Sequence, residues 1–591
     1  MARKKSVNIN NAIFADFSKG LYLLDTPRNY VEQLQSLAIT GGRNIWSEKG
    51  ALVAQHGYVI KDTILDGEQI IGITQSTSGN NSFFIVTLTG KVYLYTAYEG
   101  LKEYKTTLEG GTSAILTRRD NDLIINIAGG NFIFGSYYDE SNFVSIIENI
   151  TVSDYSTYYE FTIPAESIQY FWTGKELCVN DTDEIIITSI VESVDKTSYT
   201  IRAISAGDHP TYTDPVNIGE KTLKPITLQY KEKSTEEGVE PTTKQLTPLL
   251  FAVCSNRLFV EDVSGDIYYS QVGVIDGFDA DLGAGYFGGF YNDTSKILSM
   301  EDFLDNVLIA KGNGLYILSI GDTVEIKKIS QVGQEYATDH VIVGEKVYVF
   351  DTNSGTIVNA ISINVFGSMV SGKPVISAEY IDAANNGINN TKRVLTYNAE
   401  SEVFILYYGE FLNYGLVLTN QGTLFPRELD KTISYFLGFN QGVVFITNTN
   451  EICQDFKKGT IIPNLSYVAN FEPIALRDNR LIVSTLLEIT ELNGINYDVT
   501  TRNAGISYQR VTPSFNASSD LKVLPPFLYS DKDYKYNSFE NTSRWAEKKS
   551  AVTRIAAPMS GREGIIISIE FPANTAFCLS ALRLPDFSQG D

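Results

Sequence analysis

The chain has 591 residues, with 70 Asp and Glu against 47 Lys and Arg, a formal net charge of −23 and a pI near 4.7. This balance argues against a surface that grips nucleic acid, because binding phosphate requires clustered Lys and Arg. The length exceeds one ordinary core and predicts two to four structural units, unless a closed repeat architecture holds the chain together. The 35 Tyr and 31 Phe, with few Met and Trp, predict a mostly-β protein.

Residues 1–62 are expected to be an entry segment that joins a larger β array, with one short helix over Tyr30–Ala38. Residues 63–150 then show strand after strand at spacings of about ten residues, typical of a meander in a propeller blade or a barrel. The predicted strands here are Ile70–Ile73, Phe83–Leu88, Lys91–Tyr95, Ala114–Thr117, Leu123–Ile127 and Phe132–Phe134.

Residues 151–247 change to a more polar β pattern, in which Glu184–Ile190 and Tyr199–Ile204 are predicted to pair. The segment 231–248, KEKSTEEGVEPTTKQLTP, has almost no apolar content and contains two prolines. It is the best candidate for an exposed linker. We therefore expect 151–247 to be a small β domain inserted into the main array.

The strand pattern resumes over residues 248–500, which we assign to the main array. Polar turns that contain glycine repeatedly precede short apolar and aromatic runs, and such glycines supply the positive φ of tight turns. The turns lie at Gly90, Gly265, Gly314, Gly344 and Gly442, and they mark degenerate, blade-like repeats. Residues 501–591 contain a polar loop zone and then three closing strands, broken at 560–564 and 572–574.

The sequence nominates no catalytic residue. The three histidines, His56, His209 and His340, lie far from one another and from any cysteine. A Ser-His-Asp or Cys-His site assembled from distant segments stays open, although the residues favour structural or solvated histidines. Four scattered cysteines have no metal-ligand spacing and are expected to be buried thiols in a reducing compartment; they are Cys178, Cys254, Cys453 and Cys578.

Three loops superficially resemble ligand sites. Gly285–Gly289 lacks a phosphate-loop Lys-Ser/Thr pair and is expected to be an irregular turn. Asp351–Thr356 lacks the bidentate Glu of a calcium loop and is expected to be a hairpin turn, and Asp276–Asp281 is expected to be an acidic solvated loop. We therefore expect no cofactor, no metal and no enzymatic activity.

No apolar segment follows the basic start Met1–Lys5, and no run of about 18 apolar residues occurs, so we expect synthesis in a cytoplasm. Three phrases, in order, carry a resemblance to a known family. They are NRLFVEDVSGDIYYSQVGVIDGF, SKILSMEDFLDNVLIAKGNGLYIL and SQVGQEYATDHVIVGEKVYVFDTNSGTIVNA. They resemble the central region of the tail-nozzle proteins of short-tailed bacteriophages, the tail tubular protein B or packaged-DNA-stabilisation family. Weaker echoes are NIWSEKGALVAQHGY and SGREGIIISIEF.

This resemblance implies an irregular β-propeller with inserted and appended small β domains. It also implies a homohexameric ring in the virion tail, below the head-to-tail adaptor ring and beside tail fibres or other tail proteins. Such a ring would form the distal channel, retain packaged DNA and conduct it into the host after contact with the envelope. An acidic wall fits this role, because it lets double-stranded DNA pass without specific binding.

A second hypothesis is a β-propeller that binds or degrades host-surface glycan, since the many tyrosines could stack on sugars and carboxylates are abundant. A catalytic carboxylate pair depends on a separation that the sequence does not supply. The Ser-x-Asp-x-Gly-x-Thr-Trp boxes of sialidase-type propellers are absent. A third hypothesis is a structural β protein elsewhere in a virion or secretion particle.

Overall fold

The computed structural model describes most of the chain outside its two termini and a few internal segments. The described residues are 11–19, 29–30, 37–64, 67–75, 82–96, 99–107, 111, 114–119, 122–127, 130–225, 228–234, 240–288, 290, 293, 295–321, 324–351, 356–363, 369–370, 388, 391–419, 422–439, 442–472, 474–476, 481–491, 495, 497–503, 515–517, 551–561, 565–585 and 588–590. The expected helix over Tyr30–Ala38 and the polar zone after 503 lie mostly outside these residues.

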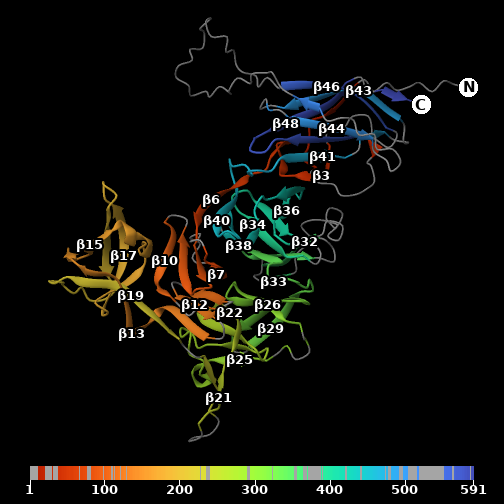
Figure 1. Ribbon diagram of the computed structural model, residues 1–591. Coiled ribbons are helices and arrows are strands. Elements are labelled where there is room, and N and C mark those ends of the chain that lie inside the picture. Colours follow the sequence, from red (N-terminus) through yellow and green to blue (C-terminus); the bar gives the residue numbers. More distant parts are fainter. Residues whose placement is uncertain are drawn as a thin grey trace, which may run out of the picture.

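The fold is mostly β and is organised around a β-propeller, as predicted (Figure 1). Within the described residues, six separate sheets have four antiparallel strands each, and the beginning of a nine-stranded sheet supplies one further blade. Each blade is a meander because short connections join consecutive antiparallel strands. The propeller therefore has seven blades in the described part of the chain.

The blades follow one another along the chain, and each is given with its strands from the centre outward. Blade 1 is β7 (Ile70–Gln75), β8 (Phe83–Thr87), β9 (Lys91–Thr96) and β10 (Gly100–Thr107). Blade 2 is β11 (Ala114–Arg119), β12 (Asp122–Ile127), β13 (Gly130–Ile150) and the end of β19 (Val216–Pro225). Blade 3 is β22 (Pro248–Cys254), β23 (Arg257–Asp262), β24 (Ile267–Tyr269) and β25 (Gly285–Phe287), with the short helix η2 (Ala280–Leu282) before β25.

The remaining blades repeat this order. Blade 4 is β26 (Ile297–Phe303), β27 (Asn306–Lys311), β28 (Gly314–Ile320) and β29 (Val324–Ser330). Blade 5 is β30 (His340–Val343), β31 (Lys346–Asp351), β32 (Thr356–Ile363) and β33 (Met369–Val370), and blade 6 is β34 (Arg393–Asn398), β35 (Val403–Tyr408), β36 (Tyr414–Leu418) and β37 (Leu424–Glu428). Blade 7 is β38 (Ile433–Phe439), β39 (Gly442–Thr447), β40 (Glu451–Lys457) and β6 (Gly57–Thr63).

The ring is closed by a strand from the N-terminal part of the chain. β6 precedes blade 1 in sequence but pairs antiparallel with β40, with Thr63 opposite Glu451 and Val59 opposite Gln454. Because blade 7 is completed by a strand that leads directly into blade 1, the first and last blades are covalently linked. The closing strands were expected at the C-terminus, so the structure differs from the sequence-based expectation here.

Apolar side chains fill the spaces between most neighbouring blades in the described part of the ring. Ile125 of blade 2 packs with Phe84 of blade 1, and Ile446 of blade 7 packs with Ile85 on the other face of blade 1. Similar clusters join blades 3 and 4, 4 and 5, 5 and 6, and 6 and 7, while β11 lies against β22 between blades 2 and 3. Burial of these residues supplies the main favourable free energy of the propeller.

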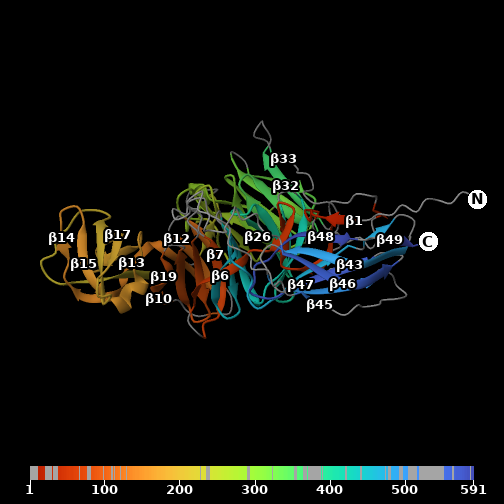
Figure 2. The same cartoon turned by 90° about the horizontal axis from the view of Figure 1, so that it is seen from above.

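The inserted domain grows out of blade 2 as a continuation of its sheet (Figures 1 and 2). β13 runs outward from the propeller and β19 returns beside it. Between them lie β14 (Ser153–Asp154), β15 (Tyr159–Pro164), the helix η1 (Ala165–Tyr170), β16 (Glu176–Val179), β17 (Asp183–Glu192) and β18 (Ser198–Ser205). The expected pairing of two strands here is confirmed as β17 with β18, and the domain has its own apolar core.

The segment expected to be an exposed linker is partly a hairpin. β20 (Gln229–Lys231) pairs with β21 (Thr243–Gln245), and residues 235–239 between them lie outside the described residues. Leu228, Tyr230 and Leu246 at the base of the hairpin are buried against blade 3. The linker assignment rested on the polar residues of 231–248 and overlooked Leu246 and the apolar residues just before the segment.

A two-sheet β-sandwich lies on the opposite side of the propeller from the insertion (Figures 1 and 2). One sheet contains β1 (Asn11–Phe14), β4 (Ile45–Glu48), β5 (Ala51–Ala54), β43 (Leu481–Glu491), β46 (Ala551–Gly561), β48 (Cys578–Pro585) and β49 (Ser588–Gly590). The other contains β3 (Ile39–Arg43), β41 (Tyr467–Phe471), β44 (Tyr497–Asn503), β45 (Phe515–Ala517) and β47 (Ile565–Phe571), while β2 (Asn29–Tyr30) pairs separately with β42 (Ala475–Leu476). Their inner faces share one apolar core, which includes Leu487, Leu579, Tyr467 and Ile569.

Two domain boundaries therefore differ from those expected. Of the described strands in residues 1–62, only β6 joins the propeller, and the others belong to the sandwich or to the β2–β42 pair. In chain order, the propeller ends with β40 of blade 7 at Lys457, so the strands between 458 and 500 belong to the sandwich or pair with β2. Alternating strands look alike in both architectures, because the period of two reports a half-buried face and says nothing about which sheet a strand joins.

The predicted strands are confirmed, and so are the glycine turns at Gly90, Gly265 and Gly344, whereas Gly314 and Gly442 are the first residues of β28 and β39. Gly90 and Gly265 have φ of 86° and 83°, which side chains with a Cβ rarely adopt, and each lies in the turn before a strand. The six strands predicted between 63 and 150 are present as β7, β8, β9, β11, β12 and β13. The three strands predicted after residue 550 are also present, as β46, β47 and β48.

We predict that replacing Gly57 of the closing strand by alanine destabilises the fold. An ideal Cβ there would lie 2.1 Å from the backbone of Ile461, whereas a Cβ on Gly207 in the insertion would meet nothing within 4 Å. Gly57→Ala should lower the free energy of unfolding by about 1–3 kcal/mol, because overpacking forces the backbone to shift. Gly207→Ala is the matched control and should unfold with the wild type in thermal denaturation. Equal midpoints for all three proteins would contradict the assignment of Gly57 to the closure seam.

Candidate functional site

Buried charged side chains gather where the structural units meet. In most proteins such residues are paired, because an isolated buried charge costs several kcal/mol. Three groups of the described buried charges lie at such joints: one around Arg393 between blades, one around Arg427 between the propeller and the sandwich, and the Lys175–Glu220 pair at the base of the insertion. Buried ion pairs between described residues are therefore found where one structural unit contacts the next.

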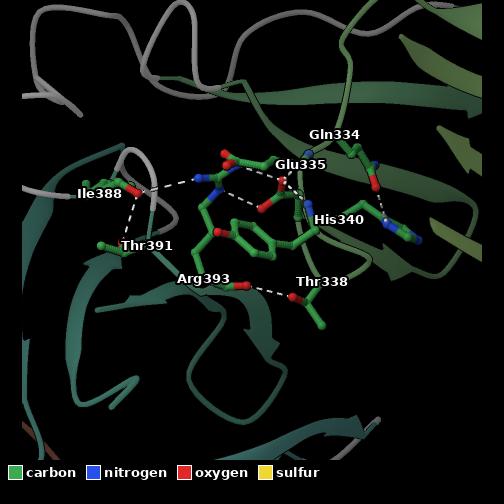
Figure 3. A network of polar contacts seen from close by, with 9 residues as sticks. Gln334, Glu335, Thr338, His340, Ile388, Thr391 and Arg393 are labelled. Carbon is green, nitrogen blue, oxygen red and sulfur yellow. Dashed lines mark hydrogen bonds and ion pairs between the residues drawn. The ribbon is translucent and has the colours of Figure 1, made fainter. Parts of the chain in front are cut away.

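The Arg393 cluster consists of Arg393, Asp339, Glu335, His340 and Glu301. Figure 3 labels Arg393, Glu335 and His340. Arg393 begins β34 of blade 6, and its Nε and Nη2 donate to the two carboxylate oxygens of Asp339 at 2.6 and 3.0 Å. Nη2 also donates to Glu335 at 2.9 Å. This bidentate geometry is the strong form of an Arg–carboxylate contact.

Asp339 organises the loop that leads into blade 5. Its Oδ2 accepts from the backbone N–H groups of Glu335 and Tyr336 at 2.9 and 3.0 Å, while Thr338 donates to the carbonyl of Arg393 at 2.6 Å. The loop between blades 4 and 5 is therefore fixed to the first residue of blade 6. Both Arg393 and Asp339 are fully buried.

His340, the first residue of β30, extends the Arg393 cluster to blade 4. Its Nδ1 lies 3.1 Å from Oε1 of Gln334, and its Nε2 lies 3.0 Å from Glu301 of β26. Burial lowers the pKa of His340, but the carboxylates of Glu301 and Asp339 raise it, and the net change is an increase. Burial raises the pKa of Glu301, but His340 lowers it by a larger amount, so the net change is a decrease. The pair therefore links blades 4 and 5 as an ion pair when His340 is protonated.

The Arg427 cluster joins blades 6 and 7 to the chain that enters from the sandwich. Arg427 of β37 pairs with Asp455 of β40, and its Nε donates to the hydroxyl of Tyr407 at 2.9 Å. Its Nη1 donates to the carbonyl of His56 at 2.8 Å and to Oε1 of Gln55 at 3.3 Å. One buried guanidinium thus contacts two blades and the segment between β5 and β6.

The Lys175–Glu220 pair holds the insertion against blade 1. Lys175 Nζ contacts Glu220, donates to the carbonyl of Tyr170 at 2.7 Å and lies 4.1 Å from the ring centroid of Trp172. Trp172 in turn packs edge-on against Tyr104 of β10, with centroids 4.8 Å apart. The insertion therefore contacts the propeller through more than its two connecting strands.

The three histidines lie in three different units. His56 packs between Trp46 and Phe456 at centroid distances of 4.9 and 5.5 Å, and burial lowers its pKa. His209 lies in the insertion with Nε2 3.1 Å from Asp154, and His340 belongs to the Arg393 cluster. The structure does not bring the histidines together.

The four cysteines occupy strands of four different sheets, and none of the four is in a disulfide. Cys178, Cys254 and Cys453 are buried, as predicted, whereas Cys578 is half-buried. Burial raises the pKa of both the Cys254 and the Cys453 thiols to about 12, so these groups stay protonated near neutral pH. Within the described residues, no group of three His, Cys, Asp or Glu side chains is arranged to hold a metal ion.

The three loops that resembled ligand sites have structural roles. Gly285–Phe287 forms the outer strand β25, so the expectation of an irregular turn is wrong there. Asp351 and Thr356 pair at the ends of β31 and β32, as a hairpin requires, and 352–355 lie outside the described residues. In the acidic loop, Asp279 caps η2 and accepts from Lys231 at 2.8 Å, and Asp281 accepts from the backbone of Ser234.

One buried carboxyl has a pKa near neutrality. Glu261 of β23 is 7% exposed, and burial raises its pKa to about 7 although Lys311 acts in the opposite direction. A general acid or base needs contact with a substrate as well as a suitable pKa. Glu261 lies on β23, between β22 and β24, and its charge interacts with Lys311 of blade 4. We therefore assign it a structural role between blades 3 and 4.

Sequence reasoning missed the Arg393 and Arg427 clusters. Their signal was weak: Arg393 opens the strand RVLTYN beside apolar residues, and Arg427 follows the apolar start of LFPRE and precedes Glu428. A charged residue at such a position indicates a buried partner. The partners lie 54 and 28 positions away in sequence, too far for local patterns to identify them.

Comparisons with known proteins find similar structures but no related sequence family. No protein-family model and no curated protein matches the chain. Among solved structures, the chain is similar to virginiamycin B lyase from Staphylococcus aureus, with 10% identity, TM-score 0.28 and coverage of 65% of this chain and 94% of that one. It is also similar to the RRP9 WD40 repeats, with 8% identity, TM-score 0.32 and coverage of 68% of this chain and 98% of that one. A third similar structure is BamB from Moraxella catarrhalis, with 10% identity, TM-score 0.28 and coverage of 68% of this chain and 96% of that one.

Identities and scores this low carry no information about activity or partners, and the propeller rests on the strand order described above. In the described part of the chain, no helix has the length and apolar character needed to cross a membrane.

We predict that Arg393→Met lowers the free energy of unfolding by about 3–5 kcal/mol, because it leaves the buried Asp339 carboxylate without its cation. The matched control is Arg202→Met. It removes an Arg–Glu pair of 2.9 Å whose arginine side chain is 50% exposed, and it should cost less than about 1 kcal/mol. Urea denaturation followed by intrinsic fluorescence measures both. Similar urea midpoints for the two variants would contradict the importance of the Arg393 cluster.

We predict that the stabilisation from His340 is lost at alkaline pH. The folded-state pKa is raised above the unfolded value of 6.5, so the contribution is complete below that pH and disappears as pH rises through the folded-state pKa. Glu301, with its lowered pKa, stays ionised throughout this range. The free energies of unfolding of the wild type and His340→Gln should therefore converge as the pH rises from about 6 into the alkaline range, through the folded-state pKa of His340. A constant difference across this range would contradict the ion pair with Glu301.

Proposed function

We propose that this chain is a virion structural protein that forms the distal tail channel, or nozzle, of a short-tailed bacteriophage. The observation that carries the proposal is the place of the three resembling phrases. In their order along the chain, they fall on β23–β24, on β26–β28 and on β30–β32, which belong to three consecutive blades of a closed propeller. The phrases therefore belong to one continuous part of the ring.

In this role the chain acts through assembly, without catalysis. Six copies would form a ring in the virion tail, in contact with the head-to-tail adaptor ring and with tail fibres or other tail proteins. The net charge of −23 favours passage of double-stranded DNA, because an acidic wall does not replace the counterions of phosphate groups. Buried ion pairs between blades support a mechanical role, since they favour one specific arrangement of the units.

We predict that the purified full-length chain, alone or with its adaptor-ring partner, assembles into rings of six copies of the 65.5-kDa protein. Native mass spectrometry gives the number of copies. Electron microscopy of the same sample should show an axial hole wide enough for duplex DNA, and the ring should not retain duplex DNA in a filter-binding assay at low salt. A chain that stays monomeric in both samples, or a ring that binds DNA tightly, would contradict the proposal.

The competing function is a propeller that binds or degrades host-surface glycan, and its degrading form gives a different result in a separate experiment. Incubation of the full-length chain with host capsule polysaccharide should release no oligosaccharide if the chain is a structural protein. Release of new reducing ends would favour the glycan-degrading alternative and contradict the absence of catalysis.

A further inference from the structure

The inserted domain exposes a stacked pair of tyrosines at its far end. Tyr155 and Tyr158 lie in the turn between β14 and β15, with ring centroids 4.8 Å apart and an interplanar angle of 13°. The guanidinium of Arg202 on β18 lies 5.1 Å from the ring centroid of Tyr158 and continues the stack. Tyr155 is 49% exposed, so the end of the stack is open to solvent.

The turn that carries these rings is held by several hydrogen bonds. Tyr155 N–H donates to the carbonyl of Tyr158 at 3.0 Å, and Asp154 accepts from Ser156 N–H at 2.8 Å and from the Thr211 hydroxyl at 3.1 Å. The backbone hydrogen bond from Ser156, with Thr211 and His209, lowers the pKa of Asp154. Because the turn is fixed in advance, a ligand that stacks on Tyr155 loses little conformational entropy of the protein.

The charges beside the stack neutralise each other. Arg202 Nε donates to Glu160 at 2.9 Å, and the two residues face each other across β15 and β18. Next along the same face, Thr162 lies opposite Thr200 and supplies hydroxyl groups. An anionic ligand would meet a paired cation in a chain of net charge −23, which disfavours nucleic acid and phosphorylated partners.

The surface is also unlike an interface between protein subunits. Val191 and Ile204 are exposed on the same sheet, at 58% and 40%. Arg202 lies between Ile204 and Thr200 on β18, and Thr200 is the cross-strand partner of Val191. The exposed apolar side chains are therefore separated by polar ones, whereas stable interfaces usually contain a contiguous apolar centre.

We propose that Tyr155 and Tyr158 form a binding platform for a neutral polysaccharide. One sugar ring offers a flat C–H face to the open, electron-rich face of Tyr155, and other sugars of the same polymer offer hydroxyl groups to the Arg202–Glu160 pair and the threonines. Figure 2 places β14 and β15 at the end of the insertion farthest from the sandwich, where a large polymer has free access. The platform binds and does not cleave, and it is independent of the nozzle role.

The test is affinity electrophoresis of the full-length chain in native gels that contain dextran, laminarin, mannan or galactomannan. At least one of these neutral polysaccharides should slow the wild-type protein. Tyr155→Ala should raise the dissociation constant for that polysaccharide by about tenfold, the size expected for loss of one stacking contact. Tyr155→Phe keeps the ring and should bind as the wild type does.

The matched control is Tyr414→Ala, which removes a tyrosine of similar exposure, 46%, from β36 of the propeller. It should leave the retardation unchanged, and thermal melting should confirm that every variant is folded. No retardation by any of the four polysaccharides would overturn the proposal, as would retardation that Tyr155→Ala does not weaken. Concentration-dependent self-association that Tyr155→Ala abolishes, without a shift in the polysaccharide gels, would assign this face to a second copy of the chain and also overturn it.

Discussion

The pairing of β6 with β40 is the constraint on which the rest of the structure depends. It joins residues from opposite ends of the propeller sequence, with Thr63 opposite Glu451. Without it, blade 7 would present an open sheet edge, and open edges pair readily with other chains. The pairing also fixes the sandwich, because β3–β5 lead directly into β6 and β41 follows β40. One strand pair thus closes the ring and brings together the two halves of a second domain.

The buried charges follow from this architecture. A propeller with an insertion and an appended sandwich has several joints at which units could slide, because apolar packing alone tolerates many relative positions. A buried Arg–carboxylate pair accepts few positions, since any shift leaves a charge without a partner. Arg393 and Arg427 lie at such joints, and Arg427 contacts both the last two blades and the segment that leaves the sandwich. Their contribution is therefore to the geometry of the assembly more than to its net stability.

The sequence predicted what local interactions determine. Turns at Gly90 and Gly265, the strands after them and the pairing of β17 with β18 all depend on residues that are near one another in the chain. The sequence did not predict which sheet each strand joins. β41 has the same alternation as the propeller strands before it, and only long-range pairing with β3 and β47 assigns it to the sandwich. The partners of Arg393 and Arg427 were missed for the same reason.

The propeller blades and the insertion differ in what their described residues do. Blades 3 to 5, which carry the family resemblance, are dominated by packing between strands, and their buried polar residues serve the ring itself. The insertion has a separate core, is tied to blade 1 by Trp172 and Lys175, and carries its exposed aromatic pair away from the ring. A surface that binds an external polymer must be reachable, whereas a ring that holds its shape must be closed and well packed. When the binding surface lies on an insertion, one chain can have both a reachable surface and a closed ring, because changes at the tip of the insertion leave the contacts between blades intact.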